Sequence, residues 1–339
     1  MNKNYSSSRR EEAHFKVRAS LRRLLLAFVF SATCLQAATN ALVAPVPVPS
    51  SPYLPRIYKY VDALLEDGAS KTNLHKHQNW LRVLYTLTDL STKAKYRDAA
   101  DSALRVWLAN VPSAEERIER PWMLWDRCFQ IDRAASEQFA LAVVKNQITN
   151  HPGFYLRACA AGYAHATNAA FLKAIETFVS GFKGPVPMSV AIDCDGVARL
   201  LPEPLASRLT ALAENQSATL ARNTATGMMY VSRYENTGRT AFREAAHAAA
   251  NENLKSPTDL PPLTLGHSIS LQLAAWRSTA RQEHLDKARA FADFALTKYF
   301  DGAPQLEPGV DTLALSLVEL HLHILYITAV RYPPNTLDR

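Results

Sequence analysis

Two tryptophans and an acidic residue stand close together in the segment 121–127, whose sequence is PWMLWDR. Trp122 and Trp125 are three residues apart, so on a helix they share one face, with Asp126 and Arg127 beside the second ring. Aromatic faces can hold a ligand by stacking, and a carboxylate at their edge can act as a general acid or base. The alternative is that both rings belong to the core, where large aromatics at helical spacing are usually found.

A second candidate is Asp193, which stands with Asp195 in an otherwise apolar stretch. A charge in such a stretch costs free energy unless it is paired or functional. Residues two apart point to different sides of a helix, so the two carboxylates cannot serve one centre if this segment is helical. One of them can face a cavity while the other caps the helix, or both can be structural.

A third concentration is the segment 228–236, MMYVSRYEN, which we expect to be an irregular loop. It contains Tyr230, Arg233 and Glu235, and loops on a rigid scaffold often carry functional residues. A solvated loop without a site is the alternative. His267 follows Gly266 at a predicted helix start, where it can face a cleft, cap the helix or pack.

Helices must position these residues, because nearly every segment has apolar residues at the three- and four-residue spacing of an amphipathic helix. We see no convincing strand, and only residues 228–232 have a β-like composition. The predicted helices are 57–66, 80–90, 95–110, 121–129, 136–148, 154–166, 169–182, 189–200, 203–220, 240–252, two within 264–300, and 311–330.

The stretch 264–300 shows the unit from which the chain is built. Its first helix ends near Trp276, the polar residues 278–283 form a turn, and a second amphipathic helix follows. The same layout recurs upstream, where Tyr163 stands eight residues before Phe171, as Trp276 stands before His284. Helical hairpins of roughly 45–50 residues are long for tetratricopeptide repeats and comparable to HEAT-type repeats.

These hairpins, with sequences such as YLRACAAGYAH followed by FLKAI and LAAW followed by HLDKARAFA, resemble the six-hairpin glycosidase superfamily. The resemblance covers about 280 residues and lies in helix rhythm and alanine-rich packing; no catalytic signature of a particular family is present. It implies an all-α (α/α) toroid, of six helical pairs, with a central cavity.

The resemblance also implies carbohydrate chemistry, in which aromatics stack on sugar rings and two carboxylates cleave the glycosidic bond. The candidate catalytic residues are then Asp126, Glu235 and Asp193. The candidate substrate-binding residues are Trp122, Trp125, Tyr230, Arg233 and His267. We expect cleavage of a poly- or oligosaccharide, by hydrolysis rather than β-elimination. The alternatives are a non-catalytic glycan-binding module or scaffold, and an open solenoid that binds protein.

The first 37 residues are typical of a signal peptide, because a basic region precedes the apolar run 24–35 and small residues follow it. That run is too short to span a bilayer, so we expect no stable membrane span after removal of the leader. Residues 38–52 are a proline-rich linker, 53–333 the toroid domain and 334–339 a C-terminal tail. The predicted location is the periplasm or the exterior.

Charge and cysteine content limit the possible partners. Residues 1–37 hold 7 of the 38 basic and 2 of the 31 acidic residues, which leaves the remainder at a formal +2. No basic stripe remains that would bind nucleic acid. Cys128, Cys159 and Cys194 have no zinc-site spacing, and one disulfide among them is possible in an oxidising compartment. His321 and His323 point to different sides of a helix, and Glu319 and His323, at i and i+4, could meet but are too few ligands for a good site. We therefore predict no metal site and no cofactor.

Overall fold

A computed structural model describes residues 51–91, 93–110, 122–146, 152–216, 223–304 and 306–330. Within these ranges the regular structure is helical, and β-pairing is limited to one isolated bridge between Val186 and Gln216. The all-α prediction is therefore confirmed. The predicted leader, nearly all of the proline-rich linker and the C-terminal tail lie outside the described residues.

Most predicted helices are present within a few residues of their expected bounds, but α3 and α12 were not predicted, and the helix predicted at 203–220 ends at Glu214. The elements in chain order are α2 (Tyr53–Glu66), α3 (Gly68–Asn73), the 3-10 turn η2 (Leu74–Lys76), α4 (Gln78–Ser91), α5 (Ala94–Leu108), α6 (Trp122–Ile131), α7 (Arg133–Lys145), α8 (Pro152–Ala166), α9 (Ala169–Gly181), α10 (Met188–Ala198), α11 (Leu205–Glu214), α12 (Thr224–Thr237), α13 (Thr240–Asn253), α14 (Pro262–Thr279), α15 (Gln282–Tyr299) and α16 (Val310–Val330).

The prediction of a loop at residues 228–236 is wrong, because this segment lies inside α12. The helix begins after Asn223, whose Oδ1 accepts a hydrogen bond from the backbone N–H of Thr226 at 2.9 Å. It ends at Gly238, which adopts φ of 69° and closes the last turn. Both signals lie outside the segment whose polar and aromatic composition suggested a loop.

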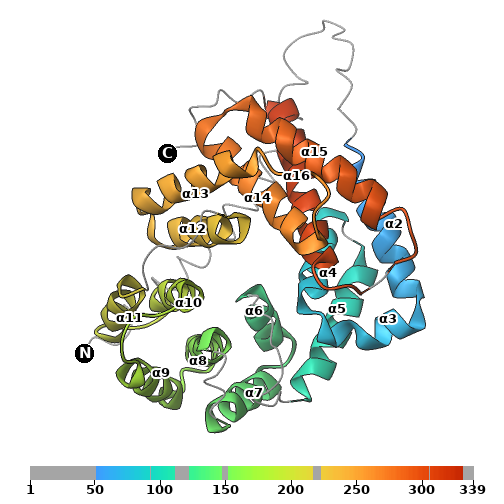
Figure 1. The fold of residues 1–339 in the computed structure, drawn as a ribbon. Coiled ribbons are helices and arrows are strands. Elements are labelled where there is room, and N and C mark those ends of the chain that lie inside the picture. The colour runs from blue at the N-terminus through green and yellow to red at the C-terminus, as the bar shows by residue number, and fades with distance from the viewer. Residues whose placement is uncertain are drawn as a thin grey trace, which may run out of the picture. The chain divides into compact units, whose positions relative to one another are not determined.

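Neighbouring helices pack as hairpins within the compact unit Pro49–Arg339. Helix α4 pairs with α5, α6 with α7, α8 with α9, α10 with α11, α12 with α13 and α14 with α15. The first members of these pairs also contact one another in order, from α4 through α6, α8, α10 and α12 to α14 (Figure 1). One helix of each hairpin therefore touches three or more helices.

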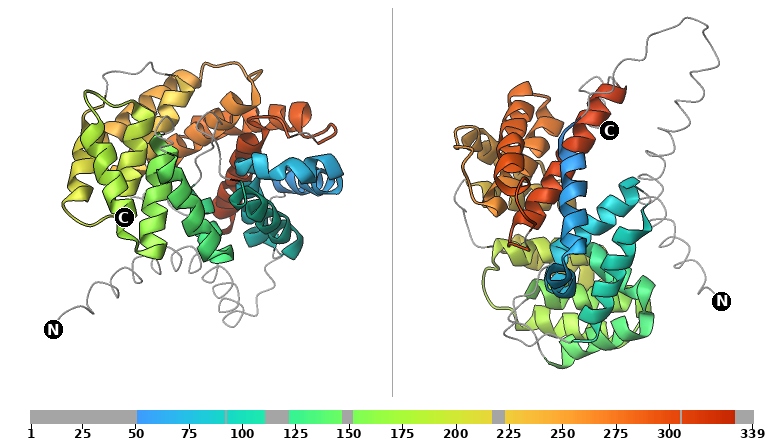
Figure 2. Two further views of the ribbon diagram at one scale, coloured as in Figure 1. Left: turned by 90° about the horizontal axis from the view of Figure 1, so that it is seen from below. Right: turned by 90° about the vertical axis from the view of Figure 1, so that its right-hand side faces the viewer.

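The last helix, α16, joins the end of this series to its beginning. It packs on α14, and also on α2 and α4, which lie far away in the sequence (Figures 1 and 2). Contacts among the described helices therefore form a closed circuit from α4 to α16 and back. Because α16 has α2 as a partner, these contacts give seven helical pairs, where the sequence predicts six.

Helix α8 is the first member of its pair and is almost completely buried. Ten consecutive residues, Gly153 to Gly162, are buried, so this helix is enclosed on all sides. Small side chains allow this enclosure, and the ring of Phe171 on α9 lies where a side chain at Gly162 would project. Close packing here depends on the glycine having no Cβ.

We expect Gly162→Ala to lower the free energy of unfolding by about 1–3 kcal/mol, because a Cβ would lie 2.4 Å from the Phe171 ring. Gly181→Ala is the matched control, since nothing lies within 4 Å of a Cβ at that position. It should change stability little or raise it by up to about 1 kcal/mol. Urea unfolding of both variants provides the measurement, and equal effects would contradict this account of the packing.

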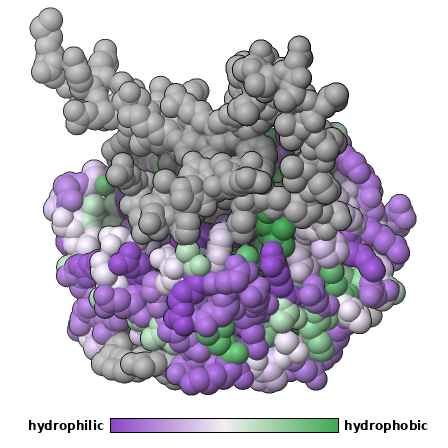
Figure 3. Space-filling view, turned by 90° about the horizontal axis from the view of Figure 1, so that it is seen from above, coloured by the Kyte–Doolittle hydropathy of each residue, from purple (hydrophilic) through white to green (hydrophobic). Residues whose placement is uncertain are grey.

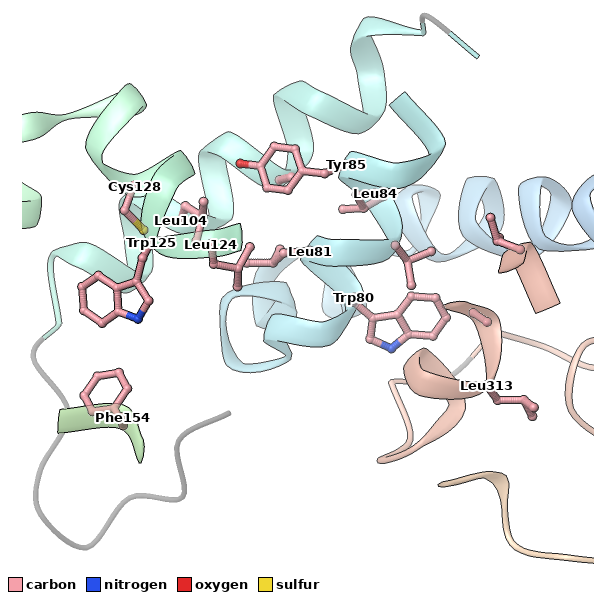
Figure 4. Packing of buried hydrophobic residues seen from close by; sticks show 14 of the residues in the cluster. Trp80, Leu81, Leu84, Tyr85, Leu104, Leu124, Trp125, Cys128, Phe154 and Leu313 are labelled. Atoms are coloured by element: carbon pink, nitrogen blue, oxygen red, sulfur yellow. The ribbon is translucent and has the colours of Figure 1, made fainter. Parts of the chain in front are cut away.

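A large hydrophobic cluster runs through the unit, and Figure 4 shows part of it around Trp80, Leu81 and Trp125. A second cluster joins α12, α13 and α14 through Val231, Leu271 and several alanines. On the face drawn in Figure 3, hydrophilic residues predominate and hydrophobic areas are small. No described helix is long and apolar enough to cross a membrane.

The cysteines behave as small core residues. Cys128, Cys159 and Cys194 are all buried and free, so the described structure contains no disulfide among them. Burial raises the pKa of the Cys128 and Cys194 thiols to about 12, and that of Cys159 also rises. Thiols with raised pKa values carry little thiolate at neutral pH and react slowly.

Candidate functional site

The aromatic segment of α6 contributes to the core. Only 4 % of Trp125 is exposed, and its ring lies 5.7 Å from that of Phe154 and 5.8 Å from that of Trp107 between centroids. This is the core alternative considered above, and Trp125 therefore offers no open face for stacking. The backbone of Trp122 begins α6, but its side chain lies outside the described part of the structure.

Asp126 is half-buried and pairs with the neighbouring hairpin. Its Oδ1 lies 2.9 Å from Nε2 of His165 on α8. The His165 ring stacks on Phe129, with 4.6 Å between centroids. This pair links α6 to α8, and within the described structure it makes no contact with the other predicted carboxylates.

Asp193 and Asp195 point to opposite neighbours of α10, as their spacing predicts. The Asp193 side chain is 1 % exposed and forms an ion pair with Arg157 on α8. Asp195 lies 2.5 Å from Nε of Arg233 on α12, with side-chain exposures of 3 % and 1 %. Both pairs brace adjacent helices, and neither carboxylate reaches solvent.

Of the remaining predicted binding residues, Arg233 and Tyr230 both pack on the ring of Phe242, and His267 lies on another helix. Arg233 is buried, and Nη1 donates to Oε1 of Gln216 at 2.5 Å. Tyr230 packs on Phe242, with ring centroids 6.3 Å apart. His267 is half-buried near the start of α14, where burial lowers its pKa.

Glu235 is the predicted carboxylate that meets other ionisable groups from different helices. Nη2 of Arg277 on α14 lies 4.0 Å from Oε1 of Glu235, and Nη1 donates to Oε1 of Glu319 on α16 at 3.0 Å. One guanidinium on α14 thus lies between two carboxylates from the helices on either side of α14 in the circuit. The two carboxylates are close enough for the charge of Glu319 to act on Glu235.

Further contacts hold Glu319 in place. Ser270 Oγ donates to its other oxygen, Oε2, at 3.0 Å. Nε2 of His323, one turn further along α16, lies 3.8 Å from Oε1 of Glu319 and 3.4 Å from Nη1 of Arg277. The ring of Trp276 meets His323 edge to face, at 5.8 Å between centroids. We call Glu235, Ser270, Trp276, Arg277, Glu319 and His323 the α12–α14–α16 cluster.

The two carboxyl groups of this cluster are shifted in opposite directions. Burial raises the pKa of Glu235, and repulsion from Glu319 adds to this effect while Arg277 opposes it. Burial also acts to raise the pKa of Glu319, but contacts with His323, Arg277 and Ser270 outweigh it and hold that pKa below its usual value. The side chain of Glu235 is 62 % exposed and that of Glu319 31 %, so both can reach a ligand.

A cavity of about 260 Å³ adjoins this cluster, between α12, α13 and α14. Glu235 and Arg277 belong to its lining, together with Tyr234, Arg243, His247 and Ser278. A larger cavity of about 540 Å³ lies among α10, α11 and α12. There Arg239 pairs with Glu214 and Arg233 with Asp195, while Arg199 donates to backbone carbonyls of α12. The smaller cavity is the better candidate site because Glu235 and Arg277 line it.

Sequence reasoning found Glu235 but did not single out Arg277. The spacing of Glu319 and His323 indicated that these two side chains could meet, and they do. That spacing gave no sign of Arg277, which stands 42 residues before Glu319. The described residues contain no group of three or more potential metal ligands.

Comparisons with models of protein families, with curated proteins and with solved structures give no match to this chain.

Proposed function

We propose that the protein cleaves glycosidic bonds of a poly- or oligosaccharide by hydrolysis, with Glu235 as general acid and Glu319 as base or nucleophile. The observation that carries the proposal is the meeting of Glu235 and Glu319, from different helices, at the guanidinium of Arg277 beside a cavity. Two carboxyl groups in different environments are what acid–base cleavage of a glycoside requires.

The roles follow from the two environments. Glu235, whose pKa is raised, is the better suited of the two to give a proton to the leaving-group oxygen. Glu319, held ionised, can activate water or attack the sugar carbon, depending on the carboxylate separation when substrate is bound.

The fold and location in this proposal are those expected from the sequence, with one change. The closed circuit of contacts supports an (α/α) toroid built from seven pairs instead of six, whose inner layer is α4, α6, α8, α10, α12, α14 and α16. The leader-like residues 1–37 support export to the periplasm or the exterior.

A pH profile of glycan hydrolysis tests the proposal. The active form needs Glu235 protonated and Glu319 ionised, and the usual glutamate pKa is 4.5. The rate should therefore fall as the pH drops through the lowered pKa of Glu319, and fall again as the pH rises through the raised pKa of Glu235. Release of reducing ends from a panel of polysaccharides at pH 3–8 provides the measurement.

Two results would contradict hydrolysis by this pair. A product that absorbs in the ultraviolet, from an unsaturated uronate, would indicate β-elimination. Binding of glycans without any turnover, across the panel and the pH range, would indicate a glycan-binding module.

A further inference from the structure

The cavity between α12, α13 and α14 combines an apolar floor with a charged rim. Leu271, Ala275 and Val231, from the second hydrophobic cluster, form its floor. Its volume of about 260 Å³ is close to the roughly 300 Å³ lower limit of small-molecule sites, so it fits one sugar ring better than a longer segment. An apolar floor suits the apolar face of such a ring.

The two arginines of the rim differ in their partners. Arg277 lies between Glu235 and Glu319, so its charge is compensated within the protein. Arg243 on α13 lies over the ring of Tyr234, at 5.9 Å from the centroid, and no described carboxylate comes within ion-pairing distance of it. Its guanidinium is half-buried and lines the cavity. An unmatched guanidinium beside an apolar floor favours an anionic group on the ligand.

His247 and Ser278, two further polar residues of the rim, carry no charge that could bind an anionic group of the ligand. His247 Nε2 and Ser278 Oγ are hydrogen-bonded to each other across α13 and α14. Burial lowers the pKa of His247, and Arg243 lowers it further, so the imidazole is neutral at pH 7. His247 and Ser278 can therefore exchange hydrogen bonds with sugar hydroxyls, while Arg243 remains the charged group.

We propose that this cavity binds a uronic acid residue, with its ring on the apolar floor and its carboxylate on Arg243. A planar guanidinium can donate two parallel hydrogen bonds to a carboxylate, which gives direction as well as charge. The proposal rests on the glycosidase function proposed above, since Glu235 and Arg277 line the same cavity. It adds the substrate class, an acidic saccharide.

Binding of glucuronate and glucose to the full-length protein tests this assignment, because the two sugars differ at a single carbon. By calorimetry, we expect glucuronate to bind at least about tenfold more tightly than glucose. Arg243→Gln should weaken glucuronate binding by roughly 10–100-fold, as expected for lost charge-assisted hydrogen bonds, and leave glucose binding unchanged. Arg243→Lys should retain part of the preference, because it keeps the charge but not the planar fork.

Arg208→Gln is the matched control, since Arg208 is an exposed arginine on α11 that pairs with Glu176. It should bind both sugars as the wild type does. Acetate tests for a site that takes any carboxylate, and acetate binding as tight as that of glucuronate would overturn the proposal. Equal binding of glucuronate and glucose, or a preference that survives Arg243→Gln, would also overturn it.

These measurements involve no turnover, so they separate the two proposals. Glucuronate binding that depends on Arg243, in a protein that cleaves no glycan, would support the binding site and contradict the hydrolase. Cleavage that depends on Glu235, without any preference for an acidic sugar, would support the hydrolase and contradict the uronate-binding site. Melting temperatures of the variants close to that of the wild type establish that the fold is retained.

Discussion

Glu235→Gln is expected to lower the rate of glycan hydrolysis by about 10²–10⁴-fold, the usual contribution of a positioned acid or base. Glutamine keeps the shape of the side chain but cannot give up a proton. The side chain is 62 % exposed at the edge of a cavity, so the substitution should leave the melting temperature nearly unchanged. The loss should appear in kcat, since the proton is transferred in the transition state.

Glu319→Gln should reduce the rate by a similar factor and also change the pH profile. Removing the negative charge of Glu319 lowers the pKa of Glu235, so any residual activity should decline at lower pH than in the wild type. Glu252→Gln serves as the control, because Glu252 is an exposed glutamate on α13 that pairs with Lys255. Wild-type rates in both the Glu235 and Glu319 variants would eliminate this pair as the catalytic groups.

Asp193→Asn should produce the largest loss of stability, about 3–5 kcal/mol in the free energy of unfolding. The reason is that Arg157, 9 % exposed in its side chain, would keep its charge in the interior but lose its ion pair with Asp193. Space is also tight there, since a Cβ on Gly153 would lie 1.8 Å from Oδ2 of Asp193. Guanidinium unfolding monitored by circular dichroism measures the effect.

Two further variants separate charge from packing. Arg157→Met combined with Asp193→Leu removes both charges, and we expect this protein to be more stable than Asp193→Asn alone. Asp286→Asn removes a carboxylate that is 60 % exposed in an ion pair with Arg289, and should change stability by less than about 0.5 kcal/mol. If Asp193→Asn lowers the free energy of unfolding no more than Asp286→Asn does, the Arg157–Asp193 pair does not stabilise the fold.

Local pattern was sufficient for most of the helices. Helix α9 begins at Ala169, as predicted, and ends one residue before the predicted Phe182. Apolar spacing and short polar turns determine such elements, because both act over a few residues. Helix α12 was missed because Tyr230, Arg233 and Glu235 gave its middle a loop-like composition, while its start and stop residues lay outside that segment.

The candidate site was less accessible to sequence reasoning. Glu235, Arg277 and Glu319 belong to three helices, and they meet because α12 packs on α14 and α14 on α16. No local pattern reports on such a meeting. Trp125 illustrates the converse, since aromatic residues at helical spacing looked suited to a ligand and instead fill the core.

The packing of α16 on α2 and α4 has a consequence for how the unit opens. Every other junction in the circuit joins helices that are close in the sequence, so chain connectivity keeps them together during a fluctuation. At the junction of α16 with α2 and α4, which we call the seam, side-chain contacts join helices from the two ends of the fold. Bringing these helices together closes nearly the whole intervening chain into a loop, at an entropic cost. Partial unfolding should therefore start by separation at this seam. Glu319 lies on α16, so its distance from Glu235 across Arg277 depends on α16 remaining packed on α2 and α4.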